Sequence, residues 1–420
     1  MKLTLAENLD LAWGRYIALA ITVLTLPSIL QWSKIPIDGS FLWLALYTLI
    51  LLCFLKLKTE FYDISNDKNI RFVLLYLSWN IVCIIRGTTV ASNYWEWKNL
   101  VGTSLVLLLP ISIYAFTNTL VVQLILKYWI KFALPAFFLF LPFFTDGDAL
   151  GRYLVPISFM ALFLPLLTKK WKIIVLCFSA IVIIGALDAR SSVIKFSICI
   201  VFSLIYYARN IISLKIIRFA RIFLLFIPIL LFYLGSAGIF NIFNIDDYYK
   251  ADLSTTVNKK GTAEHEDLKA DTRTGLYEEV LTSALKHDYV WLGRTPARGN
   301  ESQLFGEVLA EQLKTGKMER FSNEVSVLNI FTWTGTIGVI LYFLLFFQAS
   351  YLAIIKSNSL TMRIIGLFVA FRWLYAWIED FSDFDLSFII LWLLIGMCYS
   401  NSFRKMNDNQ FKYWIRAILN

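Results

Sequence analysis

The sequence contains few charged residues and very few groups that bind metals. Charged residues make up 16% of the 420-residue chain, whereas soluble domains average about 25%. The two histidines, His265 and His287, are too few and too far apart for a metal site of the usual kind. The five cysteines all lie within apolar runs and form no CxxC pair, so we expect small buried thiols rather than disulfides. We therefore expect neither a bound metal nor any other cofactor.

Apolar residues dominate what is present. Hydrophobic residues make up 58% of the chain and the mean hydropathy is +0.64. Apolar runs of roughly 17 to 25 residues recur from one end to the other, each long enough to cross a bilayer core of ~30 Å. We predict an all-α polytopic membrane protein with about twelve transmembrane helices. The predicted spans are residues 15–31, 41–57, 71–87, 99–118, 121–144, 153–168, 171–187, 191–208, 219–240, 325–352, 361–378 and 384–402.

The distribution of basic residues predicts how these spans are oriented. Lys and Arg are concentrated in alternate connections, beginning with the N-terminal segment. The positive-inside rule then places both termini in the cytoplasm. This topology accounts for the formal net charge of +9, so no nucleic-acid partner is expected. The N-terminal segment carries acidic residues and lacks a small-residue cleavage site, so we expect no cleavable signal peptide.

One connection is far longer than the others. Residues 241–323 separate predicted spans nine and ten on the outer side, and they divide the chain into segments 1–240, 241–323 and 324–420. Long connections with their own periodicity are usually functional. Two apolar stripes predict two amphipathic helices here. The stripes are Leu276, Tyr277, Val280, Leu281, Ala284 and Leu285, and then Leu304, Phe305, Val308, Leu309 and Leu313. Residues 246–269 are polar and lack periodicity, so we expect an irregular, mobile segment.

Several arginines stand at the outer ends of the predicted spans and in the long connection. They are Arg86, Arg152, Arg190, Arg273, Arg294 and Arg298. Guanidinium groups bind phosphates through paired hydrogen bonds, so their gathering at one membrane face indicates an anionic ligand. The alternative is that they extend toward lipid headgroups. Binding is favoured for Arg190, at the apex of a tight turn, and for Arg273, where a helix N-terminus also attracts anions.

Acidic residues at the same face are candidates for two roles. Glu379, Asp380, Asp383 and Asp385 form a cluster between the last two spans. We expect this cluster to pair with Arg372, which lies within a predicted span, and with the loop arginines. Glu324 stands directly before the tenth span and is a candidate base that deprotonates an attacking hydroxyl. Its alternative role is that of an acid stabilised at a helix N-terminus.

Four segments, in order, carry a family resemblance over residues 150–350. GRYLVPISFMALF has the form of a G-R segment, and ALDARSSVIKFS that of a T-R-A/S turn at the head of a span. DTRTGLYEEVLTSALKHDYVWLGR is similar to an R-x-x-x-[WY] loop signature, and TWTGTIGVILYF to a G-x-x-G opening of the following span. This ordered set resembles the O-antigen polymerase and O-antigen ligase superfamily of bacterial inner-membrane glycosyltransferases of the GT-C type.

The position of the ligase histidine separates the two branches of this superfamily. In the ligases a histidine, usually in an H-N pair, stands eleven residues before the first glycine of the G-x-x-G step. In this chain that glycine is Gly335, and Glu324 occupies the histidine's place. A shift of two positions would instead align Ser322 with the histidine and Asn323 with its neighbour. The histidine is missing in either register, which favours a polymerase over a ligase.

The resemblance implies metal-independent, inverting glycosyl transfer at the periplasmic face of the inner membrane. The implied donor and acceptor are undecaprenyl-diphosphate-linked oligosaccharides, and membrane lipid and a chain-length regulator protein are further implied partners. Arg190 and Arg273 would hold the diphosphate with help from Arg152, while Glu324 would act as the base, oriented by Asn323. Further substrate-binding candidates are Arg86, Arg294 and Arg298.

Two other functions remain open at this stage. An O-antigen ligase or related surface-glycan transferase would share the fold and differ in its acceptor. A lipid-linked oligosaccharide flippase or other transporter would also have about twelve spans. Transporters of that kind usually contain internal repeats. The sequence shows no internal repeat, which favours a glycosyltransferase.

Overall fold

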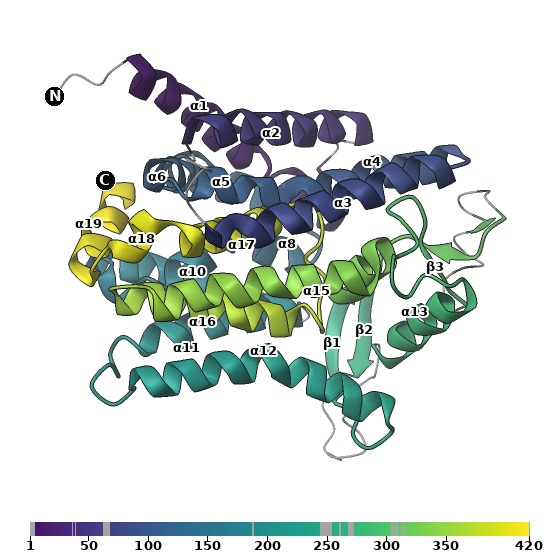
Figure 1. Ribbon diagram of the computed structural model, residues 1–420. Helices are drawn as coiled ribbons and strands as arrows, with labels where there is room; N and C mark the ends of the chain where they lie inside the picture. Colours follow the sequence, from purple (N-terminus) through teal and green to yellow (C-terminus); the bar gives the residue numbers. More distant parts are fainter. Residues whose placement is uncertain are drawn as a thin grey trace.

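The computed structural model describes residues 5–419 apart from short gaps. The gaps are residues 36, 38, 62–67, 187–188, 244–253, 260–261, 268–272, 304–305, 307–309, 312–313 and 315. Within the described residues the chain is largely helical, and the long helices run side by side as a bundle (Figure 1).

The first half of the chain contains the following elements. They are α1 (Leu5–Val23), η1 (Pro27–Trp32), α2 (Ser40–Phe61), η2 (Lys68–Ile70), α3 (Arg71–Val90), α4 (Tyr94–Leu108), η3 (Leu109–Ile111), α5 (Ser112–Phe116), α6 (Thr119–Tyr128), the π-helical turn η4 (Trp129–Ala133), α7 (Leu134–Phe140), η5 (Leu141–Phe143), α8 (Gly147–Tyr153), α9 (Val155–Ala161), η6 (Leu164–Leu166), α10 (Lys169–Gly185) and α11 (Arg190–Leu204).

The second half of the chain adds the remaining helices and four short strands. They are α12 (Leu214–Ser236), β1 (Ser254–Lys259), β2 (Thr262–Asp267), α13 (Thr274–Lys286), β3 (Asn300–Glu301), β4 (Glu319–Arg320), α15 (Ser326–Ile355), α16 (Leu360–Tyr375), α17 (Leu386–Tyr399), α18 (Asn401–Lys405) and α19 (Asp408–Leu419).

Six helical segments are long and apolar enough to cross a membrane. They are Ala12–Trp32, Arg71–Val90, Tyr94–Phe116, Thr119–Phe143, Leu214–Ser236 and Ser326–Ile355. Two shorter apolar helices, Phe41–Leu57 and Leu386–Tyr399, run beside them. The chain is therefore an α-helical membrane protein, as the composition predicted. The count of twelve spans stays a prediction, as does the orientation of the termini.

Burial distinguishes helices at the centre of the bundle from helices at its edge. Every residue of α17 is buried, and a helix that is apolar all round belongs in a core. On α12, large apolar side chains such as Phe219 and Tyr233 are exposed. In a membrane protein such a face contacts lipid, because only there does exposed apolar surface cost nothing.

The two ends of the bundle differ in what they carry. Both chain termini lie at one end, whereas α13 and β3 lie at the other (Figure 1). Helices α10 and α11 are packed neighbours, as the tight turn between them predicted. The first amphipathic helix is confirmed as α13, whose Leu276, Val280 and Ala284 are buried. The second predicted stripe lies outside the described residues.

The long connection also contains strands that the sequence did not predict. Strands β1 and β2 pair as an antiparallel hairpin, with Ser254 opposite Asp267. The expectation of an irregular segment was therefore wrong for residues 254–259 and 262–267, and the rest of the range 246–269 lies outside the described residues. Strands β3 and β4 also pair antiparallel, with Asn300 opposite Arg320. This second pair brings the two ends of segment 300–320 together directly before α15.

Helix α15 is broken near its start by Gly335. This glycine has φ 70° and ψ −175°, a combination that glycine alone adopts readily. The break leaves main-chain groups without partners inside the helix, and residues 290–294 supply them. The amide of Thr336 donates to Val290 O at 2.9 Å, and Thr332 O accepts from the amide of Arg294 at 2.7 Å. A segment of the long connection thus replaces part of a helical turn.

The contact at this break leaves no room for a side chain. A Cβ on Gly335 would lie 2.2 Å from Trp291 O. Helix α3 also contacts the break in α15, where Trp79 Nε1 donates a hydrogen bond to Thr334 O at 2.9 Å. Arg86 Nη1 donates to Leu292 O at 2.6 Å, and its Nη2 donates to Gly293 O at 3.2 Å. The break therefore joins α3, α15 and the long connection.

Substitution of Gly335 tests this constraint. We expect Gly335→Ala to destabilise the protein by about 3 kcal/mol or more, because it combines backbone strain with a main-chain clash. The measurement is the thermal unfolding midpoint and the yield of monodisperse protein in detergent. Gly102→Ala in α4 is the matched control, since a Cβ there meets nothing within 4 Å. Equal stability of the two variants would contradict the argument.

Candidate functional site

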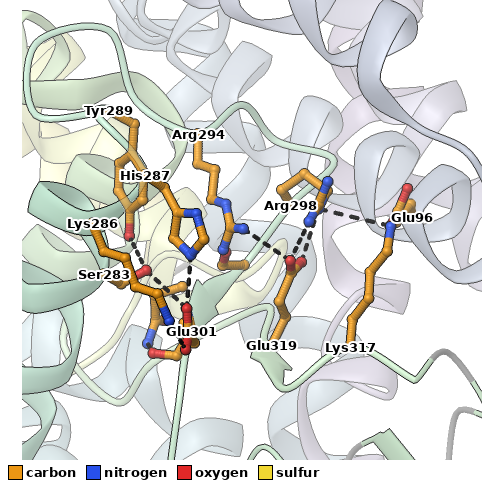
Figure 2. Close-up of polar contacts among 12 residues, drawn as sticks. Glu96, Ser283, Lys286, His287, Tyr289, Arg294, Arg298, Glu301, Lys317 and Glu319 are labelled. Carbon is orange, nitrogen blue, oxygen red and sulfur yellow. Dashed lines mark hydrogen bonds and ion pairs between the residues drawn. The ribbon is translucent and has the colours of Figure 1, made fainter.

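Two of the predicted binding arginines belong to an ion-paired network inside the long connection. Arg298 forms a paired contact with the buried carboxylate of Glu319, and Arg294 Nη2 lies 3.0 Å from the same carboxylate (Figure 2). The hydrogen bond with Glu319 raises the pKa of Arg298. Glu96 at the start of α4 lies 3.7 Å from Arg298 and also pairs with Lys317. The network fixes the long connection to α4.

A second set of polar contacts in Figure 2 fixes α13. Glu301 accepts from Lys286 at 2.6 Å and lies 2.7 Å from His287. Its pKa is lowered, chiefly by the hydrogen bond from Lys286. Tyr289 Oη donates to Ser283 Oγ, which in turn accepts from the amide of Glu301. These contacts tie the C-terminal end of α13 to β3.

The predicted binding roles of Arg86, Arg294 and Arg298 stay predictions, and the structure gives each of them protein partners. Arg86 contacts the main chain that pairs with the broken helix, and the other two contact Glu319. No sequence signal pairs Arg298 with Glu319 across twenty intervening residues. The arrangement is that of residues that hold the connection in place.

Arg273 stands at the centre of a different cluster. It is the N-cap residue of α13, and its Nε donates to Ile378 O at 3.3 Å. Its Nη1 lies 3.7 Å from Glu324, and its Nη2 lies 3.5 Å from Glu379. Burial raises the pKa of Glu379, although Lys195, Arg273 and a hydrogen bond from Ser191 oppose this shift. Arg273 thus links the start of α13 to Glu324 and to the segment after α16.

Arg190 is the sequence neighbour of Ser191, which contacts this cluster. It is the first residue of α11 and is exposed. Its neighbour Ser191 hydrogen-bonds Glu379, which is also a partner of Arg273. The start of α11 and the start of α13 therefore meet at one carboxylate.

Glu324, the predicted base, is exposed and lies between two arginines. One carboxylate oxygen is 3.7 Å from Arg273, and the other accepts from Arg320 Nη2 at 3.3 Å. The side chain is 54% exposed. Arg320 was not identified from the sequence, because a residue four positions away along an extended segment gives no periodic signal.

Asn323 does not contact Glu324 in the described part of the chain. Its amide is buried and donates to Asn300 Oδ1 at 2.9 Å. Its main chain is held by Asn329, which accepts from the amide of Asn323 and donates to its carbonyl. The predicted role of orienting Glu324 has no geometric support. Asn323 instead fixes the path of the chain between β4 and α15.

Arg152 belongs to a third group, next to a cavity. Its Nη1 donates to Asp385 at 3.1 Å, and its guanidinium group lies 3.8 Å from the centre of the Trp32 ring. The other carboxylate oxygen of Asp385 accepts from the amide of Phe388 and so caps α17. Lys195 of α11 interacts with both Asp385 and Glu379, so this group and the Arg273 cluster are neighbours.

The cavity beside Arg152 has a volume of about 540 Å³, within the ~300–1,000 Å³ range of small-molecule sites. Aromatic rings form much of its wall, and polar side chains lie between them. The aromatic residues are Trp32, Tyr47, Trp95, Phe321, Trp333 and Phe384. The polar residues include Gln31, Lys98, Asn99, Ser322, Asp383 and Asp385. These residues come from helices far apart in the chain, which is why the sequence did not predict the cavity.

Two members of the acidic cluster after α16, Asp383 and Asp385, line this cavity. The expected pairing of the cluster with a loop arginine is confirmed at Glu379, which lies 3.5 Å from Arg273. Asp380 accepts from Ser326 and from Ser382, which oppose the rise in its pKa that burial causes. Asp383 is exposed at the cavity, where partial desolvation by the cavity walls and the charges of Asp380 and Asp385 raise its pKa to about 7. Arg372 was also expected to pair with this cluster. In the structure its guanidinium group lies over the ring of Phe381, 4.0 Å from the ring centre.

Comparison with known proteins gave no match, whether with protein-family models, curated sequences or solved structures. The site must therefore be interpreted from its own geometry.

Neutralising Glu319 tests whether the loop arginines are structural. We expect Glu319→Gln to destabilise the long connection by about 3 kcal/mol, because two guanidinium groups lose a buried partner. Limited proteolysis of residues 290–320 and the thermal unfolding midpoint would measure the effect. The exposed Glu311→Gln is the matched control. A Glu319→Gln protein as resistant to protease as wild type would contradict this interpretation.

Proposed function

We propose that this protein polymerises undecaprenyl-diphosphate-linked oligosaccharide repeat units by metal-independent, inverting glycosyl transfer. The observation that carries the proposal is the meeting of three features at one end of a membrane helix bundle. These are an arginine at the start of α13, a cavity with aromatic and polar walls, and an apolar groove. A lipid-linked sugar diphosphate has an anionic, a hydroxyl-rich and an apolar part, one for each feature.

Arg273 is the centre of the proposed diphosphate site. Its guanidinium group lies 3.7 Å from Glu324 and 3.5 Å from Glu379, and in this proposal a phosphate exchanges with Glu324, whose side chain is 54% exposed. Phosphate oxygens accept shorter, charge-assisted hydrogen bonds from a guanidinium group. Arg273 also stands at the N-terminus of α13, where the helix dipole favours an anion. In this proposal Arg190 approaches from the start of α11, and Arg152 borders the sugar.

An apolar groove begins next to Arg273 and suits the lipid chain. Its volume is about 580 Å³, and it lies between α12, α13 and α16. Thr274 and Ile378 line the groove and are also the chain neighbour and the hydrogen-bond acceptor of Arg273. The other wall residues include Phe232, Phe243, Tyr277, Leu281 and Trp377. A polyprenyl chain in this groove would place its diphosphate at Arg273.

The proposal includes the topology inferred from the sequence. The chain would cross the bacterial inner membrane about twelve times in a GT-C-like arrangement, with both termini in the cytoplasm and residues 241–323 in the periplasm. Glu324 remains the base predicted from the family resemblance. A chain-length regulator protein remains a predicted partner.

Reconstitution distinguishes the proposed function from its alternatives. Purified protein in vesicles would be given undecaprenyl-diphosphate-linked repeat units, with and without lipid A–core. Polymer formed without lipid A–core supports the proposal, and transfer of single units to the core would indicate a ligase. Movement of the lipid-linked unit across the bilayer without any new glycosidic bond would indicate a transporter.

Removal of Arg273 tests the proposed diphosphate site. We expect Arg273→Ala to lower the polymerisation rate by about 10²-fold or more, since charge stabilisation of the leaving diphosphate is lost. Arg273→Lys should restore part of the rate, because an ammonium group keeps the charge without the paired geometry. The measurement is polymer yield per unit time at equal protein level. Arg209→Ala, between α11 and α12, is the control; wild-type rates from Arg273→Ala would remove the assignment.

A further inference from the structure

The cavity beside Arg152 has the chemistry of a sugar-binding site. A pyranose ring has apolar C–H faces and a rim of hydroxyl groups, so it needs flat apolar walls with polar groups between them. Trp95 and Trp333 supply such walls, and Asn99 and Asp383 supply hydrogen-bond partners. Tyr47 is held in place by stacking on Phe384, with ring centroids 4.5 Å apart. The cavity is therefore pre-formed for a hydroxyl-rich ligand.

Asp383 differs from the other acids at this end of the bundle. Asp385 pairs with Arg152 and caps α17, and Asp380 accepts hydrogen bonds from Ser326 and Ser382. Glu379 contacts Arg273. The carboxylate of Asp383 has no hydrogen bond or ion pair with any described residue, and it opens into the cavity. Its oxygens are therefore available to a ligand.

Glu324 is placed differently. Its two oxygens face Arg273 and Arg320. It also does not line the cavity. A base must lie within hydrogen-bond reach of the proton that it removes. A sugar bound between the aromatic walls would present its hydroxyl groups to Asp383.

We propose that this cavity holds the acceptor sugar and that the carboxylate of Asp383 accepts the proton of the attacking hydroxyl. The hydroxyl oxygen forms the new bond to the anomeric carbon of the donor. The bond from that carbon to the diphosphate oxygen breaks, and the diphosphate leaves with the electron pair. The hydroxyl proton passes to Asp383. This inference rests on the proposed glycosyl transfer, and it replaces Glu324 with Asp383 as the base.

The groups around Asp383 suit this role. Partial desolvation by the cavity walls and the charges of Asp380 and Asp385 from the same loop raise its pKa, while Arg152 of α8 lowers it. Tyr47 of α2 and Lys98 of α4 line the same cavity. A base works best when its pKa lies near the working pH, and that of Asp383 is about 7. Because only the ionised form accepts a proton, polymerisation should fall as the pH drops below 7.

The test compares variants in the vesicle assay over a pH range that brackets 7. We expect Asp383→Asn to slow polymerisation by about 10²–10⁴-fold. It should also abolish the fall in rate below pH 7, which is the acid limb of the pH profile. Arg152→Met should move that limb to higher pH, since it removes the cation that lowers the pKa of Asp383. Glu324→Gln should leave the acid limb of the pH profile unchanged. Asp288→Asn, an exposed acid in the long connection, is the matched control.

Two further measurements keep the result interpretable. Quenching of tryptophan fluorescence by a soluble oligosaccharide repeat unit reports whether Asp383→Asn still binds acceptor, and we expect binding within a few-fold of wild type. The thermal midpoint of Asp383→Asn at pH above 7 should equal or exceed that of wild type. The raised pKa means that the ionised group destabilises the folded state there, and the amide removes that charge.

The outcomes separate this inference from the proposed function. An Asp383→Asn protein that keeps the wild-type rate and acid limb would overturn the inference. So would loss of the acid limb in Glu324→Gln instead. In both cases polymer made by the wild type would leave the proposed function intact. A wild-type protein that forms no glycosidic bond would overturn both.

Discussion

The break in α15 at Gly335 is the constraint on which the rest of the outer end depends. A helix interrupted near a membrane must find new partners for its main-chain groups, because unpaired ones are costly in lipid. Here residues 290–294 provide them, and Arg86 and Trp79 of α3 hold both sides of the contact. The long connection is thereby fixed against the bundle. The position of α13, and with it that of Arg273, follows from this attachment.

The arginines of the long connection differ in how far their acidic partners are buried. Glu319, the partner of Arg294 and Arg298, is only 6% exposed, so no solute can replace it. Glu324, a partner of Arg273, is 54% exposed and more distant. An exposed, long ion pair contributes little to stability. The stabilising role of these arginines therefore follows the burial of the carboxylate that each one contacts.

Features local to one stretch of sequence could be predicted, and features that join distant stretches could not. The apolar runs predicted a helical membrane protein, and the stripe from Leu276 to Leu285 predicted α13. The residue that begins α11, Arg190, was also expected at the head of a helix. By contrast, the pairing of Glu319 with Arg298 depends on how residues 300–320 fold back on themselves.

The cavity shows the same limit. Trp32, Tyr47 and Trp95 come from three different helices, and single aromatic residues in apolar runs carry no signal of a shared surface. The hairpin β1–β2 was missed because its polar sequence lacks the alternation of a half-buried strand. Only packing of the whole bundle decides which side chains meet at its outer end.

The broken helix also has a consequence for how the chain is made. Residues 290–294 leave the ribosome before α15 does, so the segment that completes the helix is made before the helix itself. A helix with an unpaired turn is poorly tolerated in lipid, so α15 can settle only against a connection that has preceded it. The order of synthesis thus matches the order in which the two parts are needed.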